Sequence, residues 1–121
     1  MKRCLIVDDS RVIRRVASRI VEGLGFEAEE ADNGEKALKA STIRMPDVAI
    51  VDRDMPVMDG LTFVRELRKM DAGRRVVTIF CDIGGDPKSI NEALEAGVDE
   101  YIMKPFDSEI VRSKFLLLGI L

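Results

Sequence analysis

The chain has 121 residues, of which 46% are hydrophobic and 34% charged, with a formal net charge of −3 and no histidine. This length suits one domain that folds without disulfide or metal crosslinks, and the slight acidic excess argues against nucleic acid as a direct ligand. The absence of histidine excludes Ser-His-Asp and Cys-His catalytic groups and the usual zinc sites.

A short apolar run opens the chain and ends in two carboxylates, in the sequence MKRCLIVDDS. It is too short for a signal peptide or a membrane span, so we expect a cytoplasmic protein that does not bind membranes.

Residues 3–7 are typical of a buried strand that ends at Asp8 and Asp9. Ser10 can cap the next helix, and Gly25 can end it. The apolar positions predicted for this helix are Val12, Ile13, Val16, Ile20, Val21 and Leu24. Its arginines are interpreted as a solvated face, comprising Arg11, Arg14, Arg15 and Arg19.

The central stretch of the chain is an unbroken apolar run, residues 48–51, that ends in Asp52. Such a run is typical of a parallel strand covered on both faces. Ligands of open α/β sheets bind beyond the carboxyl ends of the strands, so Asp52 is the first candidate for chemistry. Before it, residues 26–31 are predicted to form a strand and the segment up to Pro46 a helix.

The same alternation continues to the end of the chain. A turn ending in the Asp59-Gly60 pair precedes a helix from about Leu61 to Met70. A strand over 76–81 is closed by Asp82, and a helix follows Pro87. Residues 100–103 are predicted to form a fifth strand, closed by Lys104, and the last helix begins near residue 107. Five strand and helix pairs predict an α/β fold, a parallel sheet with helices on both faces. Cys4 and Cys81 lie within strand-like runs and are expected to be buried free thiols.

Charged residues close four of these strands, and parallel strands bring their carboxyl ends to one edge of the sheet. The set comprises Asp8, Asp9, Asp52, Asp82 and Lys104. Two like charges 4 Å apart repel by about 4 kcal/mol at an effective dielectric constant near 20, so the cluster should raise some pKa values or collect a cation. Oxygen ligands favour a hard divalent ion such as Mg²⁺. A carboxylate nucleophile, a divalent ion and a lysine together suit phosphoryl transfer.

Three segments carry a resemblance to a known family: LIVDDS at 5–10, VDRDMPVMDG at 51–60 and YIMKPF at 101–106. Together they resemble the receiver domain of two-component response regulators, of the stand-alone chemotaxis type. The resemblance implies a flavodoxin-like, doubly wound, five-stranded parallel sheet of order 2-1-3-4-5 with five helices. It also implies a single receiver domain over residues 1–121 without an output domain, and a cis bond between Lys104 and Pro105.

The resemblance further implies the roles of the residues at the strand ends. Asp52 would accept a phosphoryl group from the phosphohistidine of a histidine kinase or phosphotransfer protein, with Lys104 as its catalytic partner. Mg²⁺ would be held by Asp8, Asp9, Asp52 and the backbone carbonyl of Asp54. The only catalysis implied is phosphorylation and dephosphorylation of the chain itself. Asp54 and Gly84 occupy the positions that tune hydrolysis of the acyl phosphate in this family.

One position departs from the family pattern. Receivers carry a Thr or Ser hydroxyl at the end of the fourth strand, coupled to an aromatic residue matched here by Tyr101, but this chain has Asp82 there. Thr78 lies roughly 13 Å down the strand, and Cys81 would face the opposite side. Asp82 could be protonated, join the metal site or imitate the phosphorylated state. Our hypothesis is that phosphorylation survives while its coupling to Tyr101 is altered.

The tail FLLLGIL, residues 115–121, is too apolar for one helix face to bury. Phe115 and Leu118 fit the core, whereas Leu116, Leu117 and Ile120 do not. Contiguous exposed apolar side chains usually mark an interface. We therefore predict that the last helix, the fourth helix and the fifth strand contact a downstream protein or a second copy of the chain.

Two other functions are compatible with parts of the sequence. One is a pseudo-receiver, a binding scaffold in which Asp82 has uncoupled phosphate from output. The other is a phosphatase of the haloacid-dehalogenase type, since Asp52, Arg53 and Asp54 match its DxD element. In that family the element follows the first strand, whereas here it follows the third, and the chain has no segment for a cap.

Overall fold

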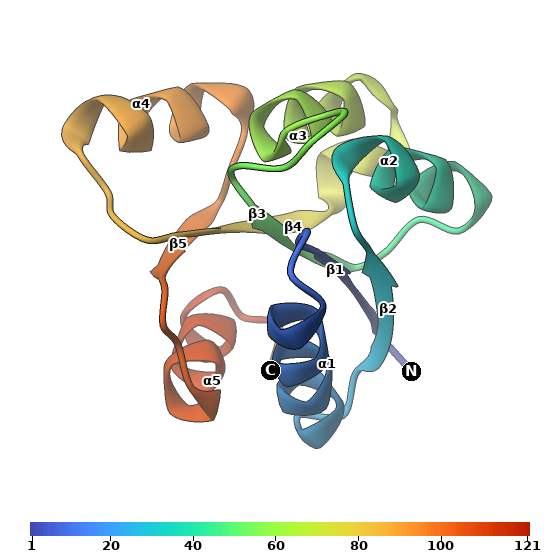
Figure 1. The fold of residues 1–121 in the computed structure, drawn as a ribbon. Coiled ribbons are helices and arrows are strands. Elements are labelled where there is room, and N and C mark those ends of the chain that lie inside the picture. Colours follow the sequence, from blue (N-terminus) through green and yellow to red (C-terminus); the bar gives the residue numbers. More distant parts are fainter.

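Strands and helices alternate along the whole chain, which the computed structural model describes from residue 1 to residue 121. Five parallel strands form one sheet in the order β2-β1-β3-β4-β5 (Figure 1). The strands are β1 (Arg3–Val7), β2 (Glu27–Ala31), β3 (Val48–Asp52), β4 (Val77–Asp82) and β5 (Glu100–Met103). The helices are α1 (Arg11–Gly23), α2 (Gly34–Ile43), α3 (Gly60–Lys69), the short 3₁₀ helix η1 (Ala72–Arg75), α4 (Pro87–Ala96) and α5 (Ser108–Leu117). The predicted flavodoxin-like architecture is confirmed.

Two helical layers cover the sheet, with α1 and α5 on one face and α2, α3 and α4 on the other (Figure 1). Successive side chains of a strand point to opposite faces, so each central strand contributes to two cores. Ile6 and Ile50 pack on the α1 and α5 side, around Phe115. Val51 and Phe80 pack on the other side. Burial on both faces explains why these strands are continuous apolar runs rather than alternating ones.

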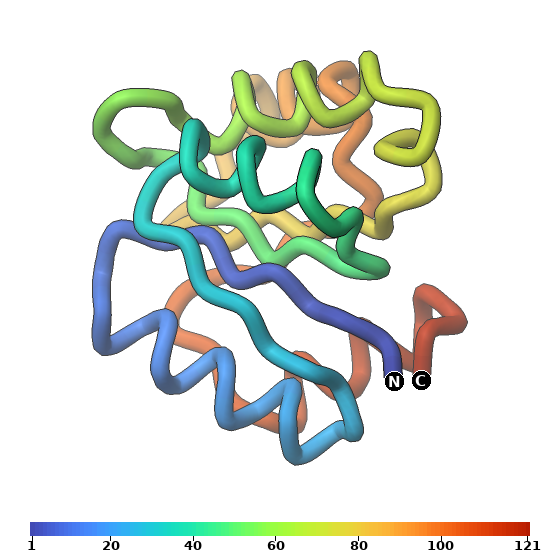
Figure 2. Tube along the Cα trace, turned by 90° about the vertical axis from the view of Figure 1, so that its right-hand side faces the viewer, coloured from blue at the N-terminus to red at the C-terminus, as the bar shows by residue number.

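Each helix after a strand begins with a side-chain cap, which keeps the connection from the preceding strand short. The capping oxygen accepts a hydrogen bond from the backbone N–H three residues later, as is usual for N-caps. The caps are Ser10, Asn33, Asp59, Asp86 and Asp107. Both chain termini lie at the opposite end of the sheet from these caps (Figure 2).

Two smaller predictions, on the cysteines and on the Lys104-Pro105 bond, are also met by the structure. Cys4 and Cys81 are buried free thiols, and the bond between Lys104 and Pro105 is cis. No helix is both long and apolar enough to cross a bilayer.

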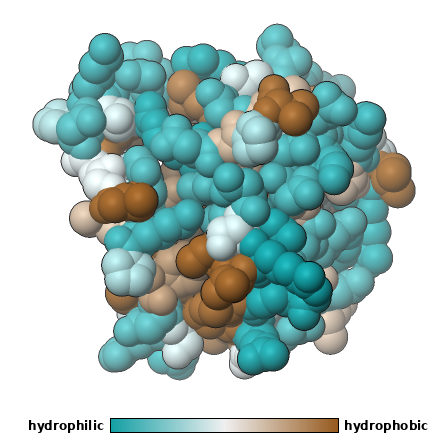
Figure 3. Space-filling model, viewed as in Figure 1, coloured by the Kyte–Doolittle hydropathy of each residue, from teal (hydrophilic) through white to brown (hydrophobic).

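The apolar stripe predicted for α1 is too wide. Val12 and Val16 are 70% and 43% exposed, and hydrophobic side chains are visible over α1 in Figure 3. The helix instead packs through Ala17 and Val21, which are buried. Small Ala17 allows α1 to lie close to the sheet, while Val12 and Val16 point to solvent.

The prediction for Ile120 is wrong, because the chain turns back after α5. Gly119 has φ +72°, and the backbone N–H of Ile120 donates to the carbonyl of Phe115 at 3.0 Å. This glycine-dependent cap returns Ile120 to the core cluster around Phe115, where it is partly buried. Leu116 and Leu117 remain 49% and 71% exposed, as predicted.

Candidate functional site

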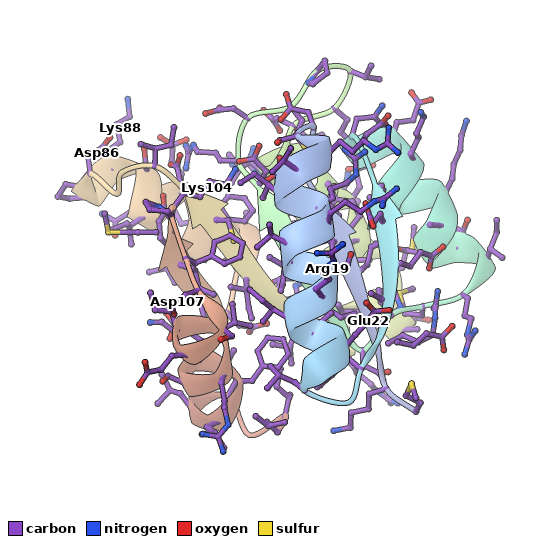
Figure 4. All side chains as sticks on the ribbon, turned by 60° about the horizontal axis from the view of Figure 1, so that its bottom comes forward. Arg19, Glu22, Asp86, Lys88, Lys104 and Asp107 are labelled. Atoms are coloured by element: carbon purple, nitrogen blue, oxygen red, sulfur yellow. The ribbon has the colours of Figure 1, made fainter.

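Lys104 joins two aspartates that are distant in sequence at the carboxyl edge of the sheet. Its Nζ donates to Oδ2 of Asp8 at 2.8 Å and to Oδ1 of Asp52 at 3.1 Å. Lys104 lies in the segment between β5 and α5, as Figure 4 shows. Asp8, Asp52 and Lys104 each follow a core isoleucine by two residues, so the strand period directs all three side chains to the α1 and α5 side. The predicted convergence is confirmed for these three residues.

Three carboxylates form an acidic cluster beside this ammonium group. One oxygen each of Asp8, Asp9 and Asp52 lies within 4.8 Å of the others. Asp8 and Asp52 are only 3% and 8% exposed, whereas Asp9 is exposed. The backbone N–H of Ser10 donates to Oδ1 of Asp8 at 2.8 Å and fixes that carboxylate. The oxygen donors of this set fit a hard divalent cation such as Mg²⁺.

Burial and charge set the protonation of the two central groups. Burial raises the pKa of Asp52 to about 6, with the charges of Asp8 and Asp9 adding to the effect and the hydrogen bond from Lys104 opposing it. Burial alone would lower the pKa of Lys104, but its hydrogen bonds to Asp8 and Asp52 outweigh burial and raise that pKa. Lys104 therefore stays charged, while burial and the neighbouring carboxylates disfavour the ionised form of Asp52.

The raised pKa of Asp52 predicts a pH-dependent stability for the metal-free protein. The stabilisation that protonation of Asp52 contributes is complete below pH 3.8 and is lost as the pH rises through about 6. Asp52→Asn should therefore raise the free energy of unfolding by about 1–2 kcal/mol at about pH 7.5 and change it little at about pH 4, allowing for solvent screening. Urea denaturation in chelator at both pH values measures the effect. Asp54→Asn, at an exposed carboxylate of the next loop, is the control, and an equal gain at both pH values for Asp52→Asn would contradict the prediction.

Asp82 lies outside the acidic cluster, which corrects the possibility that it joins the metal site. It follows Phe80 by two residues and so points to the opposite face of the sheet from Asp52. There the hydroxyl of Tyr101 donates to Oδ2 of Asp82 at 2.8 Å, and the backbone N–H of Ile83 donates to Oδ1 at 2.8 Å. Burial and the carboxylate of Asp82 raise the pKa of Tyr101 to about 12.

Neither of the alternative side chains considered from sequence replaces the missing hydroxyl. Thr78 is buried near the other end of β4 and accepts a hydrogen bond from Arg68 at 2.9 Å. Cys81 packs into the core on the α1 and α5 side. It pairs with Asp52 in the β3–β4 register, so the strand has not slipped.

Two neighbours of the cluster were not singled out as site residues. Gly60, interpreted only as part of a turn, leaves so little space that an added Cβ would lie 2.2 Å from the carbonyl oxygen of Asp52. Arg53, noted only within the DxD element, donates to the carbonyl of Ser89 at 3.2 Å and pairs with Glu92 at 3.5 Å. The cation next to Asp52 and the glycine of the following turn were visible in the sequence, but their partners are set by packing.

Comparison with known protein families decides the assignment. The sequence pattern described as the response regulator receiver domain matches residues 4–115. The chain belongs to the response regulator receiver family. This receiver is 36% identical to the chemotaxis protein CheY of Bacillus subtilis over 110 residues, 90% of each chain.

Solved structures support the same assignment. Chemotaxis protein CheY4 of Vibrio cholerae has a TM-score of 0.92 and 30% identity, over 100% of this receiver and 99% of that chain. The receiver domain of the sensor histidine kinase PA1611 from Pseudomonas aeruginosa has a TM-score of 0.86 and 28% identity, over 98% of each chain. That structure holds a magnesium ion in its active site cleft. Receiver domains bind Mg²⁺ at an acidic pocket, and this receiver has a cluster of three aspartates at the carboxyl edge of its sheet.

The two other functions considered from sequence gain no support. Asp52 ends β3, the third strand, and Asp54 follows it, whereas in DxD phosphatases the element follows the first strand. The comparisons lead to the receiver family, whose members act with histidine kinases and downstream targets.

Proposed function

We propose that this receiver is a phosphoacceptor in a two-component signalling system, phosphorylated at Asp52. The observation that carries the proposal is the position of the Lys104 ammonium group, within hydrogen-bonding distance of Asp8 and Asp52 and beside three carboxylate oxygens. A cation facing an aspartate in an oxygen-rich pocket suits phosphoryl transfer, because this reaction depends on neutralising the charge of the transferring oxygens.

The donor would be the phosphohistidine of a histidine kinase or phosphotransfer protein. An ionised oxygen of Asp52 forms the new bond to phosphorus while the bond from phosphorus to the imidazole nitrogen breaks, and the imidazole leaves. Lys104 donates a hydrogen bond to Oδ1 of Asp52 in the unphosphorylated protein. In the product it can donate to a phosphoryl oxygen instead. Asp8, Asp9, Asp52 and the backbone carbonyl of Asp54 would hold Mg²⁺, which would supply further neutralisation of the transferring oxygens when bound. The chemistry is confined to the receiver's own phosphorylation and dephosphorylation, with Asp54 and Gly84 placed to tune the latter.

Mass spectrometry with a small phosphodonor tests this function. The parent protein should gain one phosphoryl group when Mg²⁺ is present and none in chelator, because the transferring charge is then not neutralised. Asp52→Ala should gain none under either condition. Asp71→Ala removes an exposed carboxylate in the link after α3 and should behave as the parent does. A folded parent that binds neither Mg²⁺ nor phosphate would favour the pseudo-receiver scaffold instead.

We propose further that the switch between Asp52 and Tyr101 is altered in this receiver. The carboxylate of Asp82 accepts a hydrogen bond from the hydroxyl of Tyr101 even though Asp52 carries no phosphoryl group. An ionised carboxylate has no proton to donate to a phosphoryl oxygen, whereas the hydroxyl of Ser or Thr does. Tyr101 is therefore held by Asp82 beforehand and responds weakly to phosphorylation.

Asp82→Thr should restore a strong response of Tyr101. The chain has one tyrosine and no tryptophan, so tyrosine fluorescence reports on Tyr101 alone. We expect fluorescence to change little when the parent is phosphorylated and clearly when Asp82→Thr is phosphorylated, because the threonine hydroxyl moves to the phosphoryl group. Alkaline titration should also show the pKa of Tyr101 lowered from about 12 in the variant. Identical phosphorylation responses in the two proteins would remove this hypothesis.

The proposed output surface combines α4, β5 and α5, where it would meet a downstream protein or a second copy of the chain. Leu94, Met103 and Leu117 on these elements are 57%, 57% and 71% exposed, and Leu116, which precedes Leu117, is 49% exposed. A mainly apolar hollow of about 210 Å³ lies between α4 and β5, with Tyr101 in its lining. A shift of Tyr101 or α4 would change this surface directly, which links the site to the partner.

A further inference from the structure

A partly buried arginine outside the proposed ligand set holds the loop that carries two of the proposed metal ligands. Arg14 lies on α1, and its side chain is only 15% exposed. Its Nη1 donates to the backbone carbonyl oxygen of Asp8 at 2.7 Å. Its Nε donates to Oε1 of Glu30 on β2 at 3.1 Å. The guanidinium group therefore connects the edge strand to the peptide between Asp8 and Asp9.

Glu30 is itself held in place, which makes the contact rigid. Its second carboxylate oxygen accepts a hydrogen bond from the hydroxyl of Ser18 at 3.1 Å, and Ser18 is only 7% exposed. Arg14 thus has one fixed acceptor on β2 and one on the loop. A planar guanidinium with two fixed acceptors restricts the rotation of its whole side chain.

The residue that Arg14 contacts has every polar group in use. The N–H of Asp8 donates to the carbonyl of Ala31 at 3.1 Å. One carboxylate oxygen of Asp8 accepts from the N–H of Ser10, and the other from Lys104. The fourth polar group of Asp8 is its backbone carbonyl, which accepts a hydrogen bond from Arg14. Without Arg14, the peptide that joins Asp8 to Asp9 loses the contact that fixes its orientation.

We propose that Arg14 is a positioning residue for the metal site, which it supports through the Asp8 carbonyl with Glu30 as its anchor. The inference rests on the proposed function in that the cation is Mg²⁺. Outer groups that orient metal ligands typically change metal affinity by about 10–100-fold. Arg14 binds no metal itself, because a guanidinium has no lone pair to offer.

The direction of the change in Mg²⁺ affinity distinguishes a positioning role of Arg14 from a purely electrostatic one. Arg14 is positive, so its charge alone opposes the binding of a cation, and its removal would tighten Mg²⁺ binding. Loss of ligand orientation predicts the opposite, weaker binding. Arg15 is the matched control, since it carries the same charge on the same helix, is 58% exposed and lies 3.8 Å from Glu30 without contacting the Asp8 carbonyl.

Calorimetric titration with Mg²⁺ tests the proposal on the parent, Arg14→Ala, Arg14→Lys and Arg15→Ala. We expect the dissociation constant to rise about 10–100-fold in both Arg14 variants and to stay the same or fall slightly in Arg15→Ala. Arg14→Lys keeps the charge and the helix propensity but cannot make both contacts, so it remains informative if Arg14→Ala folds poorly. Urea denaturation in chelator would show whether stability and metal affinity change separately.

The possible results distinguish this inference from the function on which it rests. If the parent binds Mg²⁺ and both Arg14 variants bind it equally well or more tightly, Arg14 has no positioning role. Weakening of the same size in Arg15→Ala would also overturn the inference. A folded parent without affinity for Mg²⁺ would instead contradict the proposed function, and this inference with it.

Discussion

Gly60→Ala is expected to lower the free energy of unfolding by about 2–4 kcal/mol and to weaken phosphorylation of Asp52. A Cβ at residue 60 would lie 2.2 Å from the carbonyl oxygen of Asp52 and 2.9 Å from Cγ1 of Val51. Both atoms belong to the buried strand β3, which cannot yield easily. The N–H of Gly60 also donates to the carbonyl of Arg53 at 3.0 Å. The first turn of α3 would therefore have to move away from the site.

Urea denaturation and phosphorylation by a small phosphodonor, followed by mass spectrometry, measure the two effects. Gly84→Ala is the matched control for stability, because nothing lies within 4 Å of a Cβ at that glycine. It should change the free energy of unfolding by less than about 0.5 kcal/mol. If Gly60→Ala were as stable as Gly84→Ala, the explanation that α3 packs too closely against Asp52 to admit a side chain would be wrong.

Arg68→Ala is expected to destabilise the protein by about 2–4 kcal/mol, because it leaves several backbone carbonyls without a donor. The side chain of Arg68 is 17% exposed. Its Nη1 donates to the carbonyls of Gly73 and Val76 at 2.7 Å each. Its Nη2 donates to the carbonyl of Gly97 at 2.7 Å and to Oγ1 of Thr78 at 2.9 Å. One side chain thus joins α3, β4 and the turn before β5.

Thermal and urea denaturation compare Arg68→Ala with Arg65→Ala, an exposed arginine on the same helix. Arg65→Ala should be nearly neutral, and Arg68→Lys should lose most of the stability that Arg68→Ala loses, since an ammonium group cannot reach acceptors on three elements. Equal stability of the two alanine variants would show that water satisfies the exposed carbonyls without cost.

The sequence was sufficient to predict the fold and the centre of the site. Apolar runs of strand length, separated by helical patterns, allow few arrangements other than a parallel sheet covered on both faces. Strand ends then meet at one edge, which is why Asp8, Asp52 and Lys104 could be grouped before any coordinates. The motifs around them supplied the family, and the comparison with known families confirmed it.

Details that depend on which face a side chain takes were harder to predict. Asp82 was grouped with the other strand-end charges, yet its position two residues after Phe80 turns it toward Tyr101. Ile120 was assigned to the surface because a continuing helix would place it there, but Gly119 ends that regularity. In both cases a local backbone feature, strand parity or a left-handed turn, decides the direction of the side chain.

By itself, the sequence determined the alternation of elements, the burial of the strands and the set of charged groups at one edge, since these follow from periodicity and chain direction. Only the tertiary structure decided that a side chain at residue 60 has no room beside the carbonyl of Asp52 and that Arg14 holds the carbonyl of Asp8. Such contacts depend on how closely helices approach the sheet and on the rotamers that packing permits. Periodicity carries no information on either quantity, because it fixes a face but not a distance.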